Sequence, residues 1–514
     1  MPYAEDSRFT TEKGCLPGTR QEIIDEIIQW VNNSNGDVAS RIFFLAGVAG
    51  SGKSAIAHTV AQQFDQLKRL GSSYCFDRAD LANRNPRNLF STIALNIADI
   101  DDQWKKSLCN VVKGNRSLRT TLAVTEQFKN FILEPAKALT TVGPIVIIID
   151  ALDESTSIGD KLSRKALLDI FAKKVADLPS NFRILITARP EDDIVEALSD
   201  HPHVFCKRMD AIDKASNEAD ITLFIESELS GIRSLELEWP NRQWCRMLIE
   251  SADGLFQWAA TACRAVKEVR GGLRPTERLS RFVASGHGLD GLYTVVLDQA
   301  FDANNPLAMS RFKKVMGRIL ATREPLSISA HSELRADDEP ADLVELIVQL
   351  LGSLMSGVNQ LHVPVQALHT SFVDFLTDED RSKSYYVDPS QHNRNLTLSS
   401  LRVMEFGLCF NICNLETSHL RNVEVADLAT RVEAAILPHL SYGCRFWADH
   451  LLTTGYDATT LDAVRNFLHN HFLYWLEVLS LIRKIDSALG MLESILEWDQ
   501  DHHQVSQVIG YLFS

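Results

Sequence analysis

The first 200 residues alternate between short apolar runs and longer segments with helical spacing. The runs at 41–45, 142–149 and 182–187 are rich in β-branched and aromatic residues, and 72–77 is a further candidate strand. Runs of this kind are typical of strands buried on both faces of a parallel sheet. Between them, apolar residues recur every three to four positions, which indicates amphipathic helices. The pattern predicts an α/β domain with a doubly wound, mostly parallel sheet.

Helical spacing dominates after residue 210, where β signals are weak and confined to 326–328 and 361–365. The second half of the chain is therefore predicted to be mostly α-helical. The predicted helices are 217–230, 241–250, 255–270, 290–302, 308–321, 341–356, 366–377, 396–415, 425–450 and 459–495.

A glycine-rich loop, Gly47-Val48-Ala49-Gly50-Ser51-Gly52-Lys53-Ser54, joins the first apolar run to a helical segment. It matches the pattern G-x-x-x-x-G-K-[ST], in which glycines allow backbone N–H groups to point at phosphate oxygens and the helix N-terminus adds its dipole. In this pattern the lysine reaches the β- and γ-phosphates and the serine ligates Mg²⁺. A glycine-rich surface turn is the alternative. The predicted ATP- or ADP-binding residues of this loop are Gly47, Gly50, Ser51, Gly52, Lys53, Ser54 and Ala55.

Acidic residues follow the apolar run at 145–149. A carboxylate at the end of a buried strand beside a phosphate loop is suited to hold Mg²⁺, so we expect Asp150 to share the ion with Ser54. Either Asp153 or Glu154 is then placed to orient or deprotonate an attacking water. The alternative is that Asp150 only ends a strand and the other two cap a helix.

Arg189 comes directly after the run at 182–187. In a parallel sheet this strand end faces the same crevice, so Arg189 is a candidate sensor of the γ-phosphate. The alternative is a surface arginine held by Glu191 or Asp192. The guanine-reading string Asn-Lys-x-Asp does not occur, which favours adenine.

Charge and composition narrow the class of protein. The formal net charge of −15 argues against a surface that coats nucleic acid or an anionic membrane. Residues 326–377 contain seven acidic residues and only Arg335 as a base, so no nucleic-acid partner is expected. The N-terminus has no apolar leader, and no apolar run reaches the roughly 20 residues of a membrane span. The nine scattered cysteines favour a reducing compartment, cytosolic or nuclear, and we expect a cytoplasmic location.

The loop, the acidic strand end and the arginine, in this order, resemble the NACHT branch of the signal-transduction ATPases. Asp150-Ala151-Leu152-Asp153-Glu154 is similar to the signature of that branch, and the closest resemblance is to fungal members with a nephrocystin-type P-loop domain. Further segments that resemble family motifs are 15–20 (entry motif), 254–259 (helical domain), 367–376 (winged helix), and 447–451 and 475–479 (C-terminal helices).

The resemblance implies a nucleotide-controlled switch with slow ATP hydrolysis and self-association on activation. It places Thr19 and Arg20 near the adenine, and it implies that His369 touches the β-phosphate of ADP, although a core or capping histidine is the alternative. The family's Gly-x-Pro turn reads Gly254-Leu255-Phe256 here, which leaves the base contacts open. Other interpretations are a non-catalytic scaffold that keeps nucleotide as a structural cofactor, or a truncated member without effector and sensor parts.

The domain organisation expected from these motifs has five parts. They are a linker-like segment at 1–18, a P-loop domain at 19–205, a helical domain at 206–300, a winged-helix-like domain at 301–380 and a C-terminal helical domain at 381–514.

Overall fold

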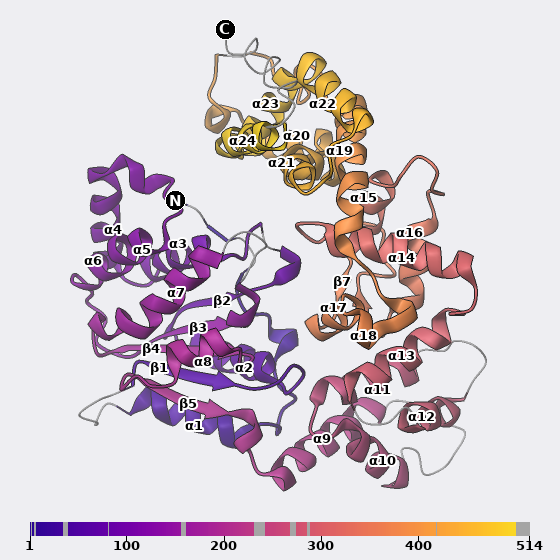
Figure 1. Ribbon diagram of the computed structural model, residues 1–514. Coiled ribbons are helices and arrows are strands. Elements are labelled where there is room, and N and C mark those ends of the chain that lie inside the picture. Colours follow the sequence, from indigo (N-terminus) through magenta and orange to yellow (C-terminus); the bar gives the residue numbers. More distant parts are fainter. Residues whose placement is uncertain are drawn as a thin grey trace. The chain divides into compact units, whose positions relative to one another are not determined.

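The structure is a computed structural model that describes residues 1, 3–4, 7–33, 40–80, 82–155, 161–230, 242–267, 274–284, 288–417 and 419–499. The chain forms two compact units (Figure 1). The first contains Met1–Val295 together with His369–Ser371, and the second contains Val296–Leu368 and the chain from Phe372 onward. Within the described segments, every helix is too short or too polar to serve as a membrane span.

A five-stranded parallel sheet forms the centre of the first unit. Its strands are β1 (Ile42–Ala46), β2 (Leu70–Cys75), β3 (Ile145–Asp150), β4 (Phe182–Ala188) and β5 (Val204–Arg208), in the order β2-β3-β4-β1-β5. The predicted α/β class is confirmed. Strand β5 was not predicted, because as an edge strand it carries the exposed residues Phe205, Cys206 and Arg208 instead of an apolar run.

Helices cover both faces of this sheet, as Figure 1 shows. Side chains of successive strand residues point to opposite faces. Phe43, Leu45 and Ile148 therefore pack with α1 (Gln21–Asn32) and α2 (Lys53–Gln66). On the other face, Phe44, Ile147 and Ile186 pack with α3 (Pro86–Ala98), α4 (Asp102–Gly114), α7 (Lys161–Lys173) and α8 (Asp192–Leu198).

One helical segment of this unit, between β2 and β3, is irregular. It consists of α5 (Val124–Gln127), a π-helical segment (Phe128–Leu133) and α6 (Glu134–Ala136). The described helices after β5 are α9 (Lys214–Leu229), α10 (Arg242–Ala252), α11 (Phe256–Lys267), α12 (Pro275–Ala284) and α13 (Leu289–Ala300), whose last turn lies in the second unit.

The second unit begins with helices and one short strand pair. Its elements include α14 (Pro306–Ala321), α15 (Ile328–Glu333), α16 (Leu343–Val348), β6 (Met355–Ser356), β7 (Gln366–Ala367) and α17 (Thr370–Leu376), whose first two residues belong to the first unit. The antiparallel pair β6–β7 and a bridge between Ser327 and Pro364 account for the weak β signals. The predictions of continuous helices over 341–356 and 366–377 were wrong, because strand residues occupy the end of one segment and the start of the other.

The C-terminal part of the second unit is a helical bundle. Trp447, Phe467 and Trp475 form the centre of its apolar core. The predicted helices 425–450 and 459–495 are each divided, the first at Pro438. Residues 500–514 of the predicted C-terminal domain lie outside the described residues. The bundle consists of α19 (Asn393–Gly407), α20 (Leu428–Ala435), α21 (Pro438–Leu452), α22 (Ala458–Asn470), α23 (Phe472–Leu481) and α24 (Ala488–Trp498).

Candidate functional site

The glycine-rich loop leaves the carboxyl end of β1 and leads into α2. Gly50 and Gly52 have φ angles of 81° and 94°, a region that glycine adopts without strain. A Cβ on Gly47 would lie 2.7 Å from the side chain of Met209, and one on Gly50 would lie 2.8 Å from Gln257. The loop therefore needs glycine for its backbone conformation and for its close packing.

Lys53 opens α2, and its side chain is buried against the loop. Its Nζ donates hydrogen bonds to the carbonyl oxygens of Gly47 at 2.7 Å and Val48 at 2.9 Å. Burial lowers the pKa of this amine from its usual value, while the nearby carboxylates of Asp153 and Asp150 oppose that shift. Ser54 and Ala55 follow in the first turn of α2, where Ser54 is exposed.

Asp150 ends β3 and is almost completely buried. The hydroxyl of Thr187, on the neighbouring strand β4, donates to Asp150 Oδ1 at 2.5 Å. The same Thr187 oxygen accepts a hydrogen bond from the backbone N–H of Ala151 at 3.1 Å. The register of two parallel strands thus fixes the orientation of this carboxylate. Thr187 could not be recognised as a site residue from the sequence, because its contact with Asp150 depends on strand pairing.

Asp153 and Arg189 bind each other closely. The backbone N–H of Arg189 donates to Asp153 Oδ1 at 3.0 Å, and Arg189 Nε lies 3.2 Å from Asp153 Oδ2. The acidic neighbour Glu191 instead pairs with Arg164 at 2.5 Å. The structure therefore brings two of the predicted catalytic residues together as an ion pair, in which Asp153 is buried and Arg189 is partly exposed.

Glu154 lies next to this pair and is also buried. Its Oε2 accepts a hydrogen bond from the backbone N–H of Arg78 at 3.2 Å. Burial, reinforced by the charges of Asp153 and Asp77, raises the pKa of Glu154 to about 8. At neutral pH this carboxyl is therefore mainly protonated.

Arg20 connects the loop to the helices that follow the sheet. It adopts a left-handed conformation at φ 58°, and its Nη2 donates to the carbonyl of Ser51 at 2.9 Å. Its backbone N–H donates to Asp220 of α9, and its guanidinium lies 4.6 Å from the ring centre of Phe256 in α11. Among the described residues, no hydrogen-bond partner satisfies its Nε and Nη1. Thr19 donates its hydroxyl to the carbonyl of Leu16.

A cavity of about 180 Å³ lies beside the loop in the first unit. The Oδ1 atom of Asn217, one of its lining residues, is buried and accepts no hydrogen bond within the described segments. The wall includes Arg20, Gly47, Val48, Ser51, Pro190, Met209, Asn217 and Leu255.

The segment around His369 belongs to the first unit by its contacts. His369 Nδ1 lies 2.6 Å from Ser371 Oγ and accepts the backbone N–H of Ser371 at 3.1 Å. The neighbouring Thr370 accepts a hydrogen bond from Arg189 Nη2 at 2.9 Å. This segment therefore contacts a predicted site residue through Thr370.

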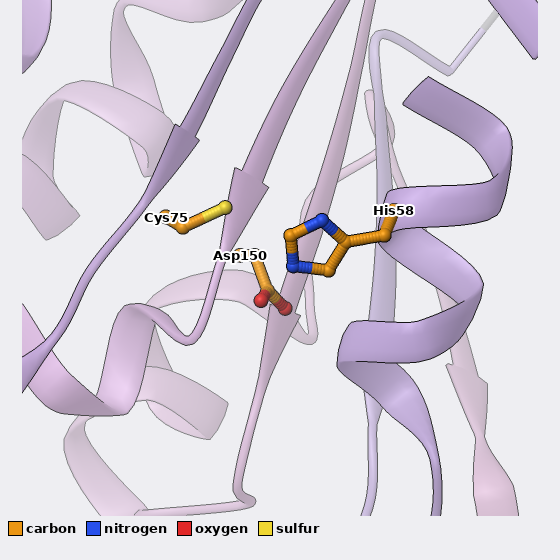
Figure 2. A group of neighbouring side chains, drawn as sticks. All are labelled: His58, Cys75 and Asp150. Atoms are coloured by element: carbon orange, nitrogen blue, oxygen red, sulfur yellow. The ribbon is translucent and has the colours of Figure 1, made fainter. Parts of the chain in front are cut away.

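Asp150 also belongs to a second group of buried side chains. His58 from α2, Cys75 from β2 and Asp150 from β3 are all buried, and their candidate ligand atoms lie within 4.8 Å of one another (Figure 2). Burial lowers the pKa of His58 and raises that of Cys75. His58 and Cys75 could not be recognised from the sequence, because no spacing along the chain links them to Asp150.

Comparison with known proteins identifies relatives. Residues 18–189 match the family described as Nephrocystin 3, N-terminal. The chain is 23% identical over 410 residues to vegetative incompatibility protein HET-E-1 of Podospora anserina. This alignment covers 73% of the present chain and 28% of that relative. The chain thus matches less than a third of the relative's length. Together with the motifs, these matches support the predicted similarity to fungal proteins of the NACHT type, with a nephrocystin 3-like segment over residues 18–189.

Proposed function

We propose that the chain is a cytoplasmic molecular switch that binds ATP or ADP with Mg²⁺, hydrolyses ATP slowly and self-associates when activated. The observation that carries the proposal is the position of the glycine-rich loop and Asp150 at the carboxyl ends of β1 and β3 in one parallel sheet. Ligands of open α/β sheets bind in the crevice at this edge.

The side chains around the loop suit a phosphate-bearing ligand. The loop is too tightly packed for any residue but glycine at Gly47, which lets backbone N–H groups approach phosphate oxygens. Arg20 has buried donor atoms with no hydrogen-bond partner among the described residues, and Asn217 has such an acceptor atom in the adjoining cavity. These groups are suited to receive the phosphates and the base or ribose, with Thr19 held beside Arg20.

Each predicted residue then has a distinct task. Gly47, whose own N–H donates to the carbonyl of Ala188, lets the loop turn towards the phosphates. Gly50, Ser51, Gly52 and Ala55 supply backbone N–H groups, and Lys53 moves its amine from the loop carbonyls to the β- and γ-phosphates. Bound Mg²⁺, held by Ser54 and Asp150, would neutralise phosphate charge. Arg189 senses the γ-phosphate: its guanidinium leaves Asp153 and binds the phosphate instead. In the resting state His369 contacts the β-phosphate of ADP, and residues 301–380 act as the winged-helix-like domain.

The arrangement of the acidic residues supports slow turnover. Both carboxylate oxygens of Asp153 are engaged by Arg189, and Glu154 is mainly protonated at neutral pH. Neither group is ready to take a proton from water until Arg189 moves or Glu154 ionises. The same observation favours the second candidate function, a scaffold that keeps nucleotide without hydrolysing it.

The test is to identify and quantify the nucleotide released when freshly purified protein is denatured. We expect about one adenine nucleotide per chain, mainly ADP. A folded protein that releases none and does not bind added ATP with Mg²⁺ would overturn the proposal. Incubation with ATP separates the two functions, since the switch forms ADP and the scaffold retains ATP.

The substitution Lys53→Ala removes the amine that lies on the loop. We expect nucleotide affinity to fall at least about 100-fold, because charge-assisted hydrogen bonds to phosphate are lost in a buried site. Equilibrium binding of a fluorescent ADP analogue measures this. Lys173→Ala, which removes an exposed lysine from α7, is the matched control and should bind as the wild type does.

A further inference from the structure

The N-terminal segment lies along the sheet domain and contacts it through several hydrogen bonds. The carbonyl of Ser7 accepts from the backbone N–H of Cys75 at 2.9 Å, and the N–H of Phe9 donates to Ser73 Oγ at 3.0 Å. Farther along, the N–H of Cys15 donates to Thr59 Oγ1 at 2.8 Å. The segment predicted as a linker therefore packs against β2 and α2 of the first unit.

One of these contacts defines the protonation of His58. The backbone N–H of Thr10 donates to His58 Nδ1 at 2.9 Å. A backbone amide can only donate, so Nδ1 carries no proton and the proton of the ring is on Nε2. His58 therefore presents an N–H group on the side of the ring away from Thr10.

That side of the ring points towards Asp150, as Figure 2 shows. The two side chains come from rigid elements, α2 and the end of β3. Asp150 Oδ1 is already bonded to the Thr187 hydroxyl at 2.5 Å, so the imidazole adds a second polar group behind the same carboxylate.

We propose that His58 is a positioning residue for Asp150, with Nε2–H oriented by the Thr10 amide and directed at the carboxylate that receives Mg²⁺. This inference rests on the proposed function, because it assigns a task towards the cation of that site. Groups that orient a metal ligand from behind typically change metal affinity 10–100-fold when they are removed. The N-terminal segment thereby contributes to the cation site through one hydrogen bond.

The same three side chains, His58, Cys75 and Asp150, have the donor types that zinc binds. The Thr10 contact argues against this use, because a zinc ligand at Nε2 needs a free lone pair there and normally donates a proton from Nδ1. Burial also raises the pKa of the Cys75 thiol, which disfavours the thiolate that zinc requires.

The experiment measures ADP binding to the full chain at a series of Mg²⁺ concentrations and in excess EDTA. Four proteins are compared: wild type, His58→Leu, His58→Gln and His58→Asn. Leucine has no N–H. Glutamine can place an amide N–H near the position of Nε2. Asparagine is one methylene shorter, so its amide reaches only the position of Nδ1, next to Thr10. Gln66→Leu, at the exposed end of α2, is the matched control.

Mg²⁺ is expected to strengthen ADP binding, and half of this effect is reached at a certain Mg²⁺ concentration. For His58→Leu and His58→Asn we expect that concentration to rise about 10-fold. Affinity for ADP in EDTA should change less than about twofold, and His58→Gln should retain most of the wild-type Mg²⁺ affinity. Melting temperatures verify folding, and the pair of glutamine and asparagine variants preserves the test if the leucine variant does not fold.

Three results would overturn the inference. One is an unchanged Mg²⁺ requirement in the leucine and asparagine variants. Another is an equal loss of ADP affinity with and without Mg²⁺. The third is stoichiometric Zn²⁺ binding that is lost in both His58→Leu and Cys75→Ser, which would make Nε2 a ligand. A wild-type protein that binds no nucleotide would instead overturn the proposed function itself.

Discussion

Glu154 is a buried acid that lies beside a second acid and has a raised pKa, of about 8. In the unfolded chain the same carboxyl ionises near pH 4.5. Between these two values the folded protein binds the extra proton, so a rise in pH favours unfolding. The contribution of Glu154 therefore lowers stability as the pH rises from about 4.5 to about 8, and it is constant above that range.

The substitution Glu154→Gln should remove this dependence, because the amide is neutral and its oxygen can still accept from Arg78 N–H. We expect the melting temperature of the variant to equal that of the wild type at pH 4.5 and to exceed it increasingly up to pH 8. The first unit, which contains Glu154, should shift its melting temperature by roughly 2 °C for each kcal/mol. Thermal unfolding across this pH range measures the difference. A constant difference between the two proteins would contradict the raised pKa.

At the residue scale, the sequence was informative where the chemistry is local. The glycines, Lys53 and Ser54 are consecutive, so the pattern alone places them on one loop. Thr187 and His58 could not be identified in this way, because their contacts with Asp150 join strands and helices that are distant in sequence. The contact of Arg189 with Asp153 was not anticipated either, because it joins the ends of two strands that are distant in sequence.

At the scale of elements, apolar periodicity located most helices but not their ends. The segment 425–450 has continuous helical spacing, yet α20 and α21 are separate because Pro438 lacks the N–H of a helix interior and instead begins α21. Strand β5 was missed because it is an edge strand with several exposed residues and therefore has no continuous apolar run. Buried strands β1, β3 and β4 were found because both of their faces are apolar.

Helix α15 carries a buried histidine that lowers the stability of the fold. His331 is fully buried, and neither ring nitrogen has a hydrogen-bond partner in the part of the chain that the structure describes. Burial, together with the charge of Arg318, lowers its pKa to about 3. The unfolded histidine binds a proton below about pH 6.5, so this residue removes stability as the pH falls from 6.5 towards 3.

We expect His331→Leu to stabilise the second unit, because an apolar side chain of similar volume replaces a polar ring without partners. The gain should be about 1 kcal/mol or more at pH 7.5 and larger at pH 5. Chemical denaturation at both pH values provides the measurement. His469→Leu, at an exposed position of α22, is the control and should change stability little. A destabilised His331→Leu protein would show that the ring has a partner or an essential shape.

At the scale of the whole molecule, the chain forms two compact units with separate apolar cores. The residues proposed to bind nucleotide all lie in the first unit, including His369. We therefore expect two thermal transitions in scanning calorimetry, of which only one responds to nucleotide.

Saturating ADP with Mg²⁺ should raise one transition and leave the other unchanged. A ligand at 100 times its dissociation constant adds about 2.7 kcal/mol to the unit that binds it. Lys53→Ala is the control, and its two transitions should not respond. A shift of both transitions in the wild-type protein would contradict the assignment of binding to the first unit alone.

The strand order has a consequence for how the site tolerates change. Strand β4 lies between β1, which leads into the loop, and β3, which ends at Asp150. Neighbouring strands are about 4.8 Å apart, so the backbone ladder holds the two halves of the site roughly 10 Å apart whatever side chains the strands carry. The spacing of the strands therefore sets the distance between the loop and Asp150 that a ligand must span. Apolar exchanges within these strands should leave that spacing intact, whereas a shifted register of β4 would misplace both Thr187 and Arg189.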